Sequence, residues 1–361
     1  MIMDISDYMF NKIVSDESFH LPRRWDGDDF YTTIDLLYKK YINLLSKVFS
    51  DNEFKDIEYI CNNILKSISH YHMGYPSKAF DKFSSVMKRL KSKPLTIYRK
   101  SGWINIFEND DPLKLYRIRN VQNNISYKRE HIFHTPYNLR SKVSSCRYSI
   151  SGYPSLYLGT SLELCIEETK IKNITEMTIV SRYKIERSML NNERIEINVL
   201  ELGIKPQDFL LNETNEDADE IKIDSARRKS LNEVSLNSDD VKISYLYWYP
   251  LIAASSFIRV NKIEPFASEY IIPQLVMQWV RNQYKKGKLI GIRYFSCASN
   301  KASELGFNYV FPVSGQTYYQ RNYCNVLANS FRLTKPYYIH EFNDINHCEE
   351  TLTNDMDLDK I

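Results

Sequence analysis

The stretch Cys146–Glu168, CRYSISGYPSLYLGTSLELCIEE, indicates more about the fold than any other part of this chain. The Gly-Tyr-Pro sequence at 152–154 is typical of a turn. The next residues, Ser155–Leu158, favour a short β-strand. Thr160 or Ser161 can then cap a helix whose first turns carry three glutamates. The stretch therefore predicts a turn, a strand and a helix in direct succession.

Three side chains of this unit suggest a binding site. Arg147, Tyr157 and Glu168 would place a cation, an aromatic ring and a carboxylate on one strand–helix unit. An arginine binds phosphate through paired hydrogen bonds, and a tyrosine ring stacks on a flat ligand. A carboxylate stabilises a cationic transition state. The trio suits a ligand that contains a phosphate, a flat ring and a bond that breaks with development of positive charge.

Four further segments extend this pattern on both sides. They are Leu115–Arg119 (LYRIR), Phe133–Val143 (FHTPYNLRSKV) and the pair formed by Glu269–Gln283 and Gly291–Ser296 (GIRYFS). With these segments in this order, residues 100–340 resemble the RES-domain family. The chain departs from the family pattern at Cys146, where many members have glycine, and at Ser149, where asparagine is frequent.

The resemblance implies a fold, an activity and a set of site residues. RES domains are related in fold to ADP-ribosyltransferases and consume NAD, so we expect an α+β protein with a mixed β core flanked by helices. The family's catalytic residues correspond to Arg117, Glu168 and Ser296. The substrate-binding residues correspond to Tyr157, Arg147 and Tyr148.

Each catalytic assignment has a competing interpretation. Glu167 is the expected solvated glutamate unless the helix register differs by one residue. Arg119 would point to the opposite side of the strand from Arg117, because side chains alternate. Ser299 lies close to Ser296, and a serine at a strand end is often only a cap. Tyr157 could be one more buried tyrosine of the core, and Arg147 could belong to a structural turn.

The amino-terminal part has a different pattern. Apolar residues recur at helical spacing in three segments, which predicts three helices joined by short connections within residues 1–95. This region resembles the HEPN-like helical extensions that precede some RES domains. We expect it to be a regulatory domain, followed by the RES domain at 96–345 and an acidic, disordered tail at 346–361. A polar insertion is expected around 212–241.

Within the second region the sequence predicts individual elements. Short strands are expected at 95–98, 114–118, 155–158, 177–183, 194–201, 289–295 and 308–313, and a helix at 271–284. A short helix could lie at 225–231. The apolar and aromatic segment 245–260 is expected to be buried.

Arg129 and His134 form an Arg-x4-His sequence, which is the ribonuclease motif of HEPN domains. The pair lies outside the amino-terminal helical region and between the RES-like motifs. His70 and His72 lie inside that region, but no arginine precedes them at the required spacing. We therefore expect no HEPN nuclease, and no metal site.

Composition narrows the class of protein. The 361 residues include 48 lysines and arginines against 45 aspartates and glutamates, a net charge of +3. This balance gives no argument for nucleic-acid or membrane binding, which favour a concentrated basic surface. The six cysteines form no CxxC pair, and the amino terminus lacks a signal-peptide pattern. We expect a cytoplasmic protein with reduced thiols.

The leading functional hypothesis is an NAD glycohydrolase or phosphorylase that acts as a toxin or a phage-defence effector. One alternative is an ADP-ribosyltransferase that modifies a protein, because only the acceptor differs. Another is a non-catalytic binding module. No cofactor is expected beyond NAD as the substrate. The resemblance implies an antitoxin or trigger protein as a partner, and leaves restraint by the helical domain and homo-oligomer formation open.

Overall fold

The computed structural model describes residues 7–25, 29–46, 49, 51–91, 103–105, 113–121, 126–169, 177–186, 189–190, 193–194, 196–210, 239–259, 261, 263–283, 288–313 and 322–361. These residues form two compact units. The first contains the described residues up to 103, residues 204–210 and residues 239–279. The second contains residues 104–203 and 280–361 as far as they are described.

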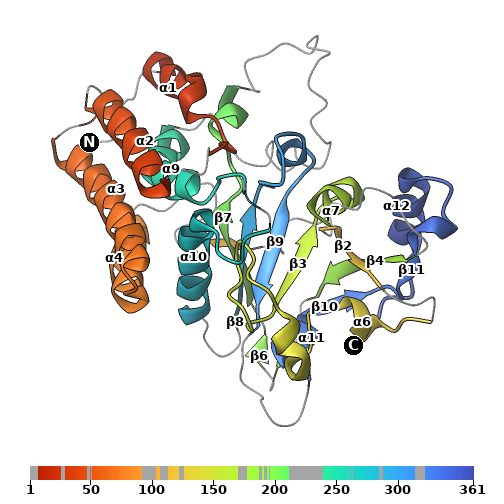
Figure 1. The fold of residues 1–361 in the computed structure, drawn as a ribbon. Coiled ribbons are helices and arrows are strands. Elements are labelled where there is room, and N and C mark those ends of the chain that lie inside the picture. The colour runs from red at the N-terminus through yellow and green to blue at the C-terminus, as the bar shows by residue number, and fades with distance from the viewer. Residues whose placement is uncertain are drawn as a thin grey trace. The chain divides into compact units, whose positions relative to one another are not determined.

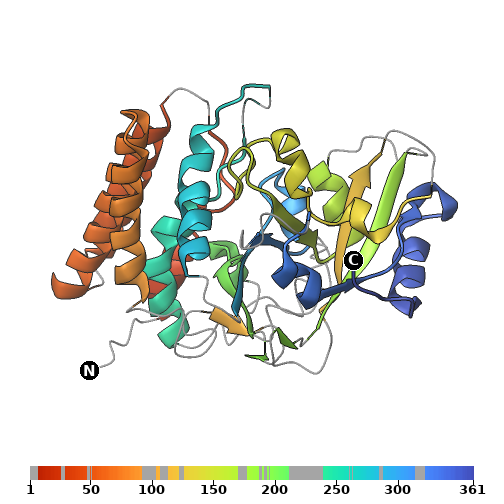
Figure 2. The same ribbon diagram turned by 90° about the horizontal axis from the view of Figure 1, so that it is seen from below.

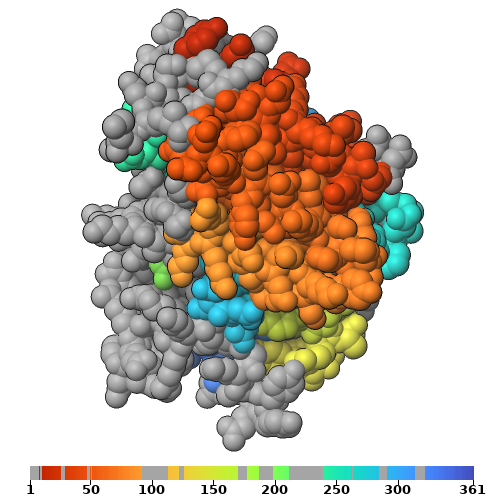
Figure 3. Space-filling view, turned by 90° about the vertical axis from the view of Figure 1, so that its left-hand side faces the viewer, coloured from red at the N-terminus to blue at the C-terminus, as the bar shows by residue number. Residues whose placement is uncertain are grey.

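Three amphipathic helices form the outer part of the first unit. They are α2 (Phe30–Leu45), α3 (Asp51–His72) and α4 (Pro76–Lys91). Asp29 caps α2 by accepting hydrogen bonds from the main-chain nitrogens of Tyr31 and Thr32. Helices α3 and α4 lie side by side (Figure 2), and their side chains form a continuous surface in Figure 3. The three helices expected from the apolar spacing are confirmed. A shorter helix, α1 (Asp7–Val14), precedes them.

A buried helix, α9 (Asp239–Ala254), packs against this group. It is apolar on nearly all sides and contains Pro250, which has no N–H for the carbonyl of Leu246. The hydroxyl of Tyr41 donates a 2.7 Å hydrogen bond to that carbonyl instead. Tyr38 donates similarly to the carbonyl of Pro250, at 2.6 Å. Two tyrosines of α2 therefore satisfy polar groups at the proline of α9.

The boundary expected at residue 95 does not describe the first unit completely. Helix α9, the 3-10 helix η3 (Pro206–Leu210) and residues up to Trp279 of α10 (Ile271–Asn282) are grouped with the amino-terminal helices. The reason is burial, because the tyrosines and tryptophan of α9 fill the interior of this unit. Segment 245–260 is indeed buried as far as Phe257, as a helix continued by a short extended stretch, and residues 258 and 259 are half-buried.

A mixed β-sheet dominates the second unit (Figure 1). Its strand order is β1-β7-β8-β9-β3-β2-β4-β10, and β11 pairs with β4. The strands are β1 (Trp103–Asn105), β2 (Leu115–Asn120), β3 (Ser155–Gly159), β4 (Thr178–Ile185), β7 (Glu196–Leu202), β8 (Lys288–Tyr294), β9 (Asn308–Pro312), β10 (Phe331–Leu333) and β11 (Tyr337–Tyr338). β5 (Met189–Leu190) and β6 (Glu193–Arg194) form a separate pair. The α+β class and the predicted strands that fall on described residues are confirmed.

Register across the sheet brings distant segments together. Tyr294 of β8 pairs with Asn308 of β9, which in turn pairs with Gly159 of β3. Gly159 pairs with Tyr116 of β2, the single aligned pair between those strands. Directly opposed residues of antiparallel strands project to the same face. Tyr294, Asn308 and Tyr116 therefore lie on one face.

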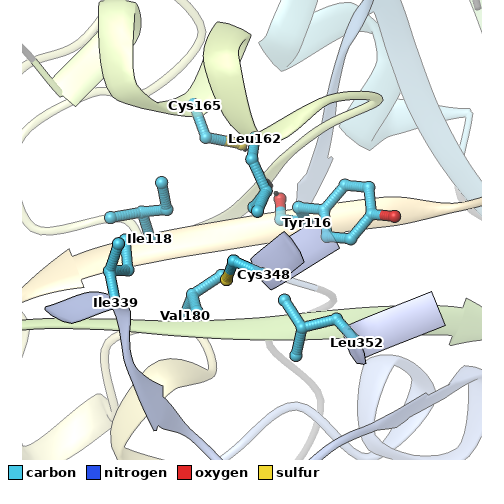
Figure 4. Packing of buried hydrophobic residues seen from close by; sticks show 8 residues of the cluster. All are labelled: Tyr116, Ile118, Leu162, Cys165, Val180, Ile339, Cys348 and Leu352. Carbon is cyan, nitrogen blue, oxygen red and sulfur yellow. Dashed lines mark hydrogen bonds between the residues drawn. The ribbon is translucent and has the colours of Figure 1, made fainter. Parts of the chain in front are cut away.

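Two helices, α7 (Leu162–Thr169) and α12 (Ile345–Asn354), cover this face over β2 and β4. Figure 4 shows their side chains packed with Tyr116, Ile118 and Val180. Cys348 and Leu352 of α12 are fully buried there. The expectation of a disordered tail at 346–361 is therefore wrong. The segment is acidic overall, but Cys348 and Leu352 lie one helical turn apart and pack α12 onto the sheet.

The remaining described elements are short: η1 (Glu17–Phe19), α6 (Arg129–Ile132), η2 (Tyr137–Lys142), η4 (Ser268–Tyr270), η5 (Lys301–Glu304), α11 (Asn325–Ser330) and η6 (Ile339–Glu341). The strand expected at 95–98, the helix at 225–231 and nearly all of the polar insertion at 212–241 lie outside the described residues. Among the helices that the structure describes, none is both long and apolar enough to span a bilayer.

Candidate active site

Helix α7 directs Glu168 toward the β-sheet. Ser161 caps the helix, since its Oγ accepts a hydrogen bond from the main-chain nitrogen of Leu164. Glu167 forms an ion pair with Lys301 at 3.2 Å. Glu168 instead accepts a 2.5 Å hydrogen bond at Oε1 from the side-chain amide of Asn308. Of the two neighbouring glutamates, Glu168 is therefore the one that contacts the sheet.

Tyr294, at the end of β8, lies among the predicted site residues. Burial and the charge of Glu168 raise the pKa of its hydroxyl well above the ordinary value for tyrosine. Tyr157 and Tyr148 act in the same direction, and Arg147 opposes them. The ring of Tyr148 lies 4.7 Å from that of Tyr294, centroid to centroid. This network brings four of the six predicted residues, Glu168, Tyr157, Arg147 and Tyr148, around one phenol.

The turn at 146–149 forms one wall of this group. Cys146 and Ser149 pair through two main-chain hydrogen bonds of 2.9 and 3.2 Å. The hydroxyl of Ser149 lies 2.8 Å from that of Tyr157. Arg147 and Tyr148, between them, are 9% and 1% exposed. The two positions that depart from the RES pattern therefore close the turn, and Ser149 also holds the Tyr157 hydroxyl.

Arg117 projects from β2 and contacts the neighbouring strand. Its Nη1 donates a 2.8 Å hydrogen bond to the carbonyl of Tyr157. Its Nε is buried and has no hydrogen-bond partner among the described residues. Burial lowers the pKa of this guanidinium below its usual range. A buried, incompletely satisfied guanidinium suits an anionic ligand group.

The structure does not place Arg117 in direct contact with Glu168. Arg117 pairs with Ser181 of β4, and it alternates with Tyr116 along β2. It therefore leaves β2 on the face opposite to the one that α7 covers. Burial raises the pKa of the Cys165 thiol to about 12, with a further rise from Glu168 and an opposing effect of Arg117. Both charged groups thus act on Cys165, and Arg117 reaches the candidate site through the Tyr157 carbonyl.

Ser296 is fully buried just after β8. Its Oγ accepts a 3.1 Å hydrogen bond from the main-chain nitrogen of Ala298, which closes a local turn. Ser299 makes the equivalent contact with Ala302 at 3.0 Å. Ser296 and Ser299 thus make the same kind of local turn contact. Its hydroxyl proton remains able to donate.

Arg129 and His134, the pair of the Arg-x4-His sequence, each bond to other parts of the second unit. Arg129 binds the carbonyl of Leu333 and both the carbonyl and carboxylate of Asp357, each at 2.8 Å. His134 is fully buried, with its nitrogens bonded to Thr135 and Cys324. Burial lowers the pKa of His134 to about 4, so the imidazole is neutral at pH 7. Both residues have structural roles.

The site can be summarised chemically. It contains one carboxylate held by an amide, three tyrosine rings and two arginines. A carboxylate beside aromatic rings can stabilise a cationic sugar, and arginines can bind phosphate. The sequence motifs did not single out Tyr294 and Asn308 as site residues. Tyr294 lies inside the GIRYFS motif, so that motif could have identified it as a site residue. Asn308 lies in no motif, and its position near Glu168 follows from the pairing of β9 with β3 and β8.

Comparisons with known proteins were made for the whole chain. No protein-family model matches it, and no solved structure matches it. The chain is 26% identical over 343 residues to a Bacillus subtilis (strain 168) protein named "Putative toxin YopC". The alignment covers 91% of this chain and 70% of that protein. The chain is thus a distant relative of a protein named as a toxin.

Proposed function

We propose that this protein is a toxin of the RES type that cleaves the nicotinamide–ribose bond of NAD inside cells. The observation that carries the proposal is the group formed by Glu168, Tyr157, Tyr148 and Arg147 around Tyr294. The similarity to a protein named as a toxin supports the toxic outcome. NAD contains the three features that this group suits: a pyrophosphate, a flat ring and a glycosidic bond.

Each residue of the group has a separate role in the proposed reaction. The bond between nicotinamide and ribose breaks with positive charge on the sugar, as in glycosidases. Glu168 stabilises that charge or binds the ribose hydroxyls, and Asn308 keeps its carboxylate in place. Tyr157 offers its ring to nicotinamide. Arg147 is the arginine of this group that can bind the pyrophosphate, and Arg117 contacts the group from the opposite face of the sheet through the carbonyl of Tyr157.

Tyr294 contributes a neutral hydroxyl. Because burial and Glu168 raise its pKa far above the ordinary value, it stays protonated across the physiological range. It can donate a hydrogen bond to a ribose hydroxyl or to the carboxamide without adding negative charge.

The test uses purified full-length protein and NAD labelled in the adenine portion. We expect release of free ADP-ribose or its phosphate by wild type, and loss of release in Glu168→Gln. Label retained on a macromolecule would instead indicate an ADP-ribosyltransferase. NAD that stays intact with wild type under all conditions, with no label transferred, contradicts the proposal.

A further inference from the structure

The best-defined contact in the site involves a residue that the motifs do not include. Asn308 is 6% exposed, and its Nδ2 donates to Glu168 Oε1 at 2.5 Å. The other carboxylate oxygen of Glu168 has no hydrogen-bond partner among the described residues. Asn308 thus fixes one of the two oxygens of this carboxylate.

Asn308 itself is held rigidly. It begins β9, which is paired on both sides, with Tyr294 of β8 and with Gly159 of β3. The preceding residue, Phe307, exchanges two hydrogen bonds with Thr160, of 3.0 Å and 2.9 Å. A side chain on a central strand has less freedom than one on a loop.

A buried ion pair fixes the same segment from the other face. Arg293 and Glu201 face each other across β8 and β7 and are 4% and 2% exposed. The guanidinium of Arg293 lies 4.5 Å from the ring centroid of Phe307. Gly306 precedes this ring at φ +133°, where a side chain would also collide with Thr160. These contacts fix the position from which Asn308 reaches Glu168.

We propose that Asn308 is the positioning residue for Glu168, holding the carboxylate so that its free oxygen faces the ribose. The inference rests on the proposed NAD cleavage. Asparagine suits this role because its amide donates two hydrogens and carries no charge.

Two variants test the role in purified full-length protein. In Asn308→Asp, a second carboxyl lies at hydrogen-bond distance from Glu168, and the two groups share a proton. We expect the acid limb of the pH–activity profile to move up by about one pH unit or more, with partial recovery at alkaline pH. In Asn308→Ala we expect kcat to fall by about tenfold to a hundredfold, with a smaller change in KM.

Asn63→Asp is the matched control. Asn63 is also 6% exposed, and its amide donates to the carbonyl of Tyr59 in α3, in the first unit. This variant reports on the cost of a buried carboxyl outside the site, and its pH profile should follow that of wild type. Circular dichroism of all variants confirms that the compared proteins are folded.

The outcomes separate the two proposals. Active wild type with a shifted Asn308→Asp profile supports the positioning role. Active wild type with an Asn308→Asp profile that is lowered equally at all pH values, or unchanged, overturns it and leaves the proposed function standing. Wild type without NAD cleavage overturns the proposed function, and the positioning role with it.

Discussion

The guanidinium of Arg117 donates a 2.8 Å hydrogen bond to the main-chain carbonyl of Tyr157, and so links β2 to β3. Only one aligned residue pair joins these two strands, Tyr116 with Gly159. The side chain of Arg117 therefore adds a second link between two strands that are joined by one aligned main-chain pair. The Nε of the same guanidinium is buried, and it has no hydrogen-bond partner among the described residues.

Substitution of Arg117 by lysine tests its part in binding. Lysine keeps the charge but loses the planar, fixed set of donors, so it holds the Tyr157 carbonyl and an anion together less well. We expect KM for NAD to rise about tenfold or more, because each lost charged hydrogen bond costs roughly 1.5–3 kcal/mol. Steady-state kinetics measures this effect. Arg119→Lys is the control, since the hydrogen bond that Arg119 makes within the described part of the chain goes to the carbonyl of His131. Equal effects in both variants contradict a special role for Arg117.

Ser296 and Ser299 make the same kind of local turn contact, which allows a direct comparison. If Ser296 also bonds the substrate, Ser296→Ala should lower kcat/KM by about threefold to tenfold, since a hydrogen bond between neutral groups contributes about 0.5–1.5 kcal/mol. Ser299→Ala should leave kcat/KM within a factor of about two. Kinetic assays on both variants decide the point. A similar small loss in both would show that Ser296 only shapes the turn.

The hydroxyl of Tyr41 replaces the hydrogen bond that Pro250 cannot supply in α9. Tyr41→Phe leaves the buried carbonyl of Leu246 without this partner. We expect the free energy of unfolding to fall by about 1–3 kcal/mol. Urea denaturation measures the change. Tyr59→Phe, at an exposed position of α3, should change stability by less than about 0.5 kcal/mol. Equal stabilities of the two variants would be inconsistent with this account of Pro250.

His134 predicts a pH dependence of stability. Burial lowers its pKa to about 4 in the folded protein, whereas the ordinary pKa of histidine is 6.5. Between these values the unfolded chain binds more protons, so stability falls as the pH drops from 6.5 toward 4. The largest contribution is on the order of 3 kcal/mol. Neutral imidazole accepts from the main-chain nitrogen of Cys324, a bond that protonation would remove.

The measurement is urea denaturation of wild type and His134→Asn from pH 4.5 to 7.5. The variant should be less stable at pH 7 but should lose less stability on acidification. His347→Asn, at an exposed position of α12, is the control. If the free energy of unfolding depended on pH in the same way for wild type and His134→Asn, His134 would not be the cause of the pH dependence.

The elements that sequence predicted best are those whose signal is local. Helices α2, α3 and α4 follow from apolar spacing, and α7 follows from its serine cap and glutamates. Two elements were missed for opposite reasons. Helix α9 is apolar on almost every side, so it shows no helical stripe. The sequence around α12 is acidic, and only Cys348 and Leu352 mark its buried side.

The residues of the candidate site also differ in whether a local sequence pattern could identify them. The motifs identified Glu168, Tyr157, Arg147 and Tyr148, which the structure brings together around Tyr294. Asn308 could not be identified, because its contact with Glu168 depends on pairing between strands that are distant in sequence. Register between such strands is fixed by the whole sheet and leaves no local pattern.

The most direct test of the account is the NAD content of cells on induced expression of the full-length protein. Wild type, Glu168→Ala and Glu167→Ala are compared at matched protein levels. We expect NAD to collapse with wild type and with Glu167→Ala, since Glu167 is bound to Lys301 on the outer side of α7. NAD should stay at the uninduced level with Glu168→Ala. Equal depletion with wild type and Glu168→Ala, or growth arrest by wild type with NAD unchanged, would contradict the proposed chemistry.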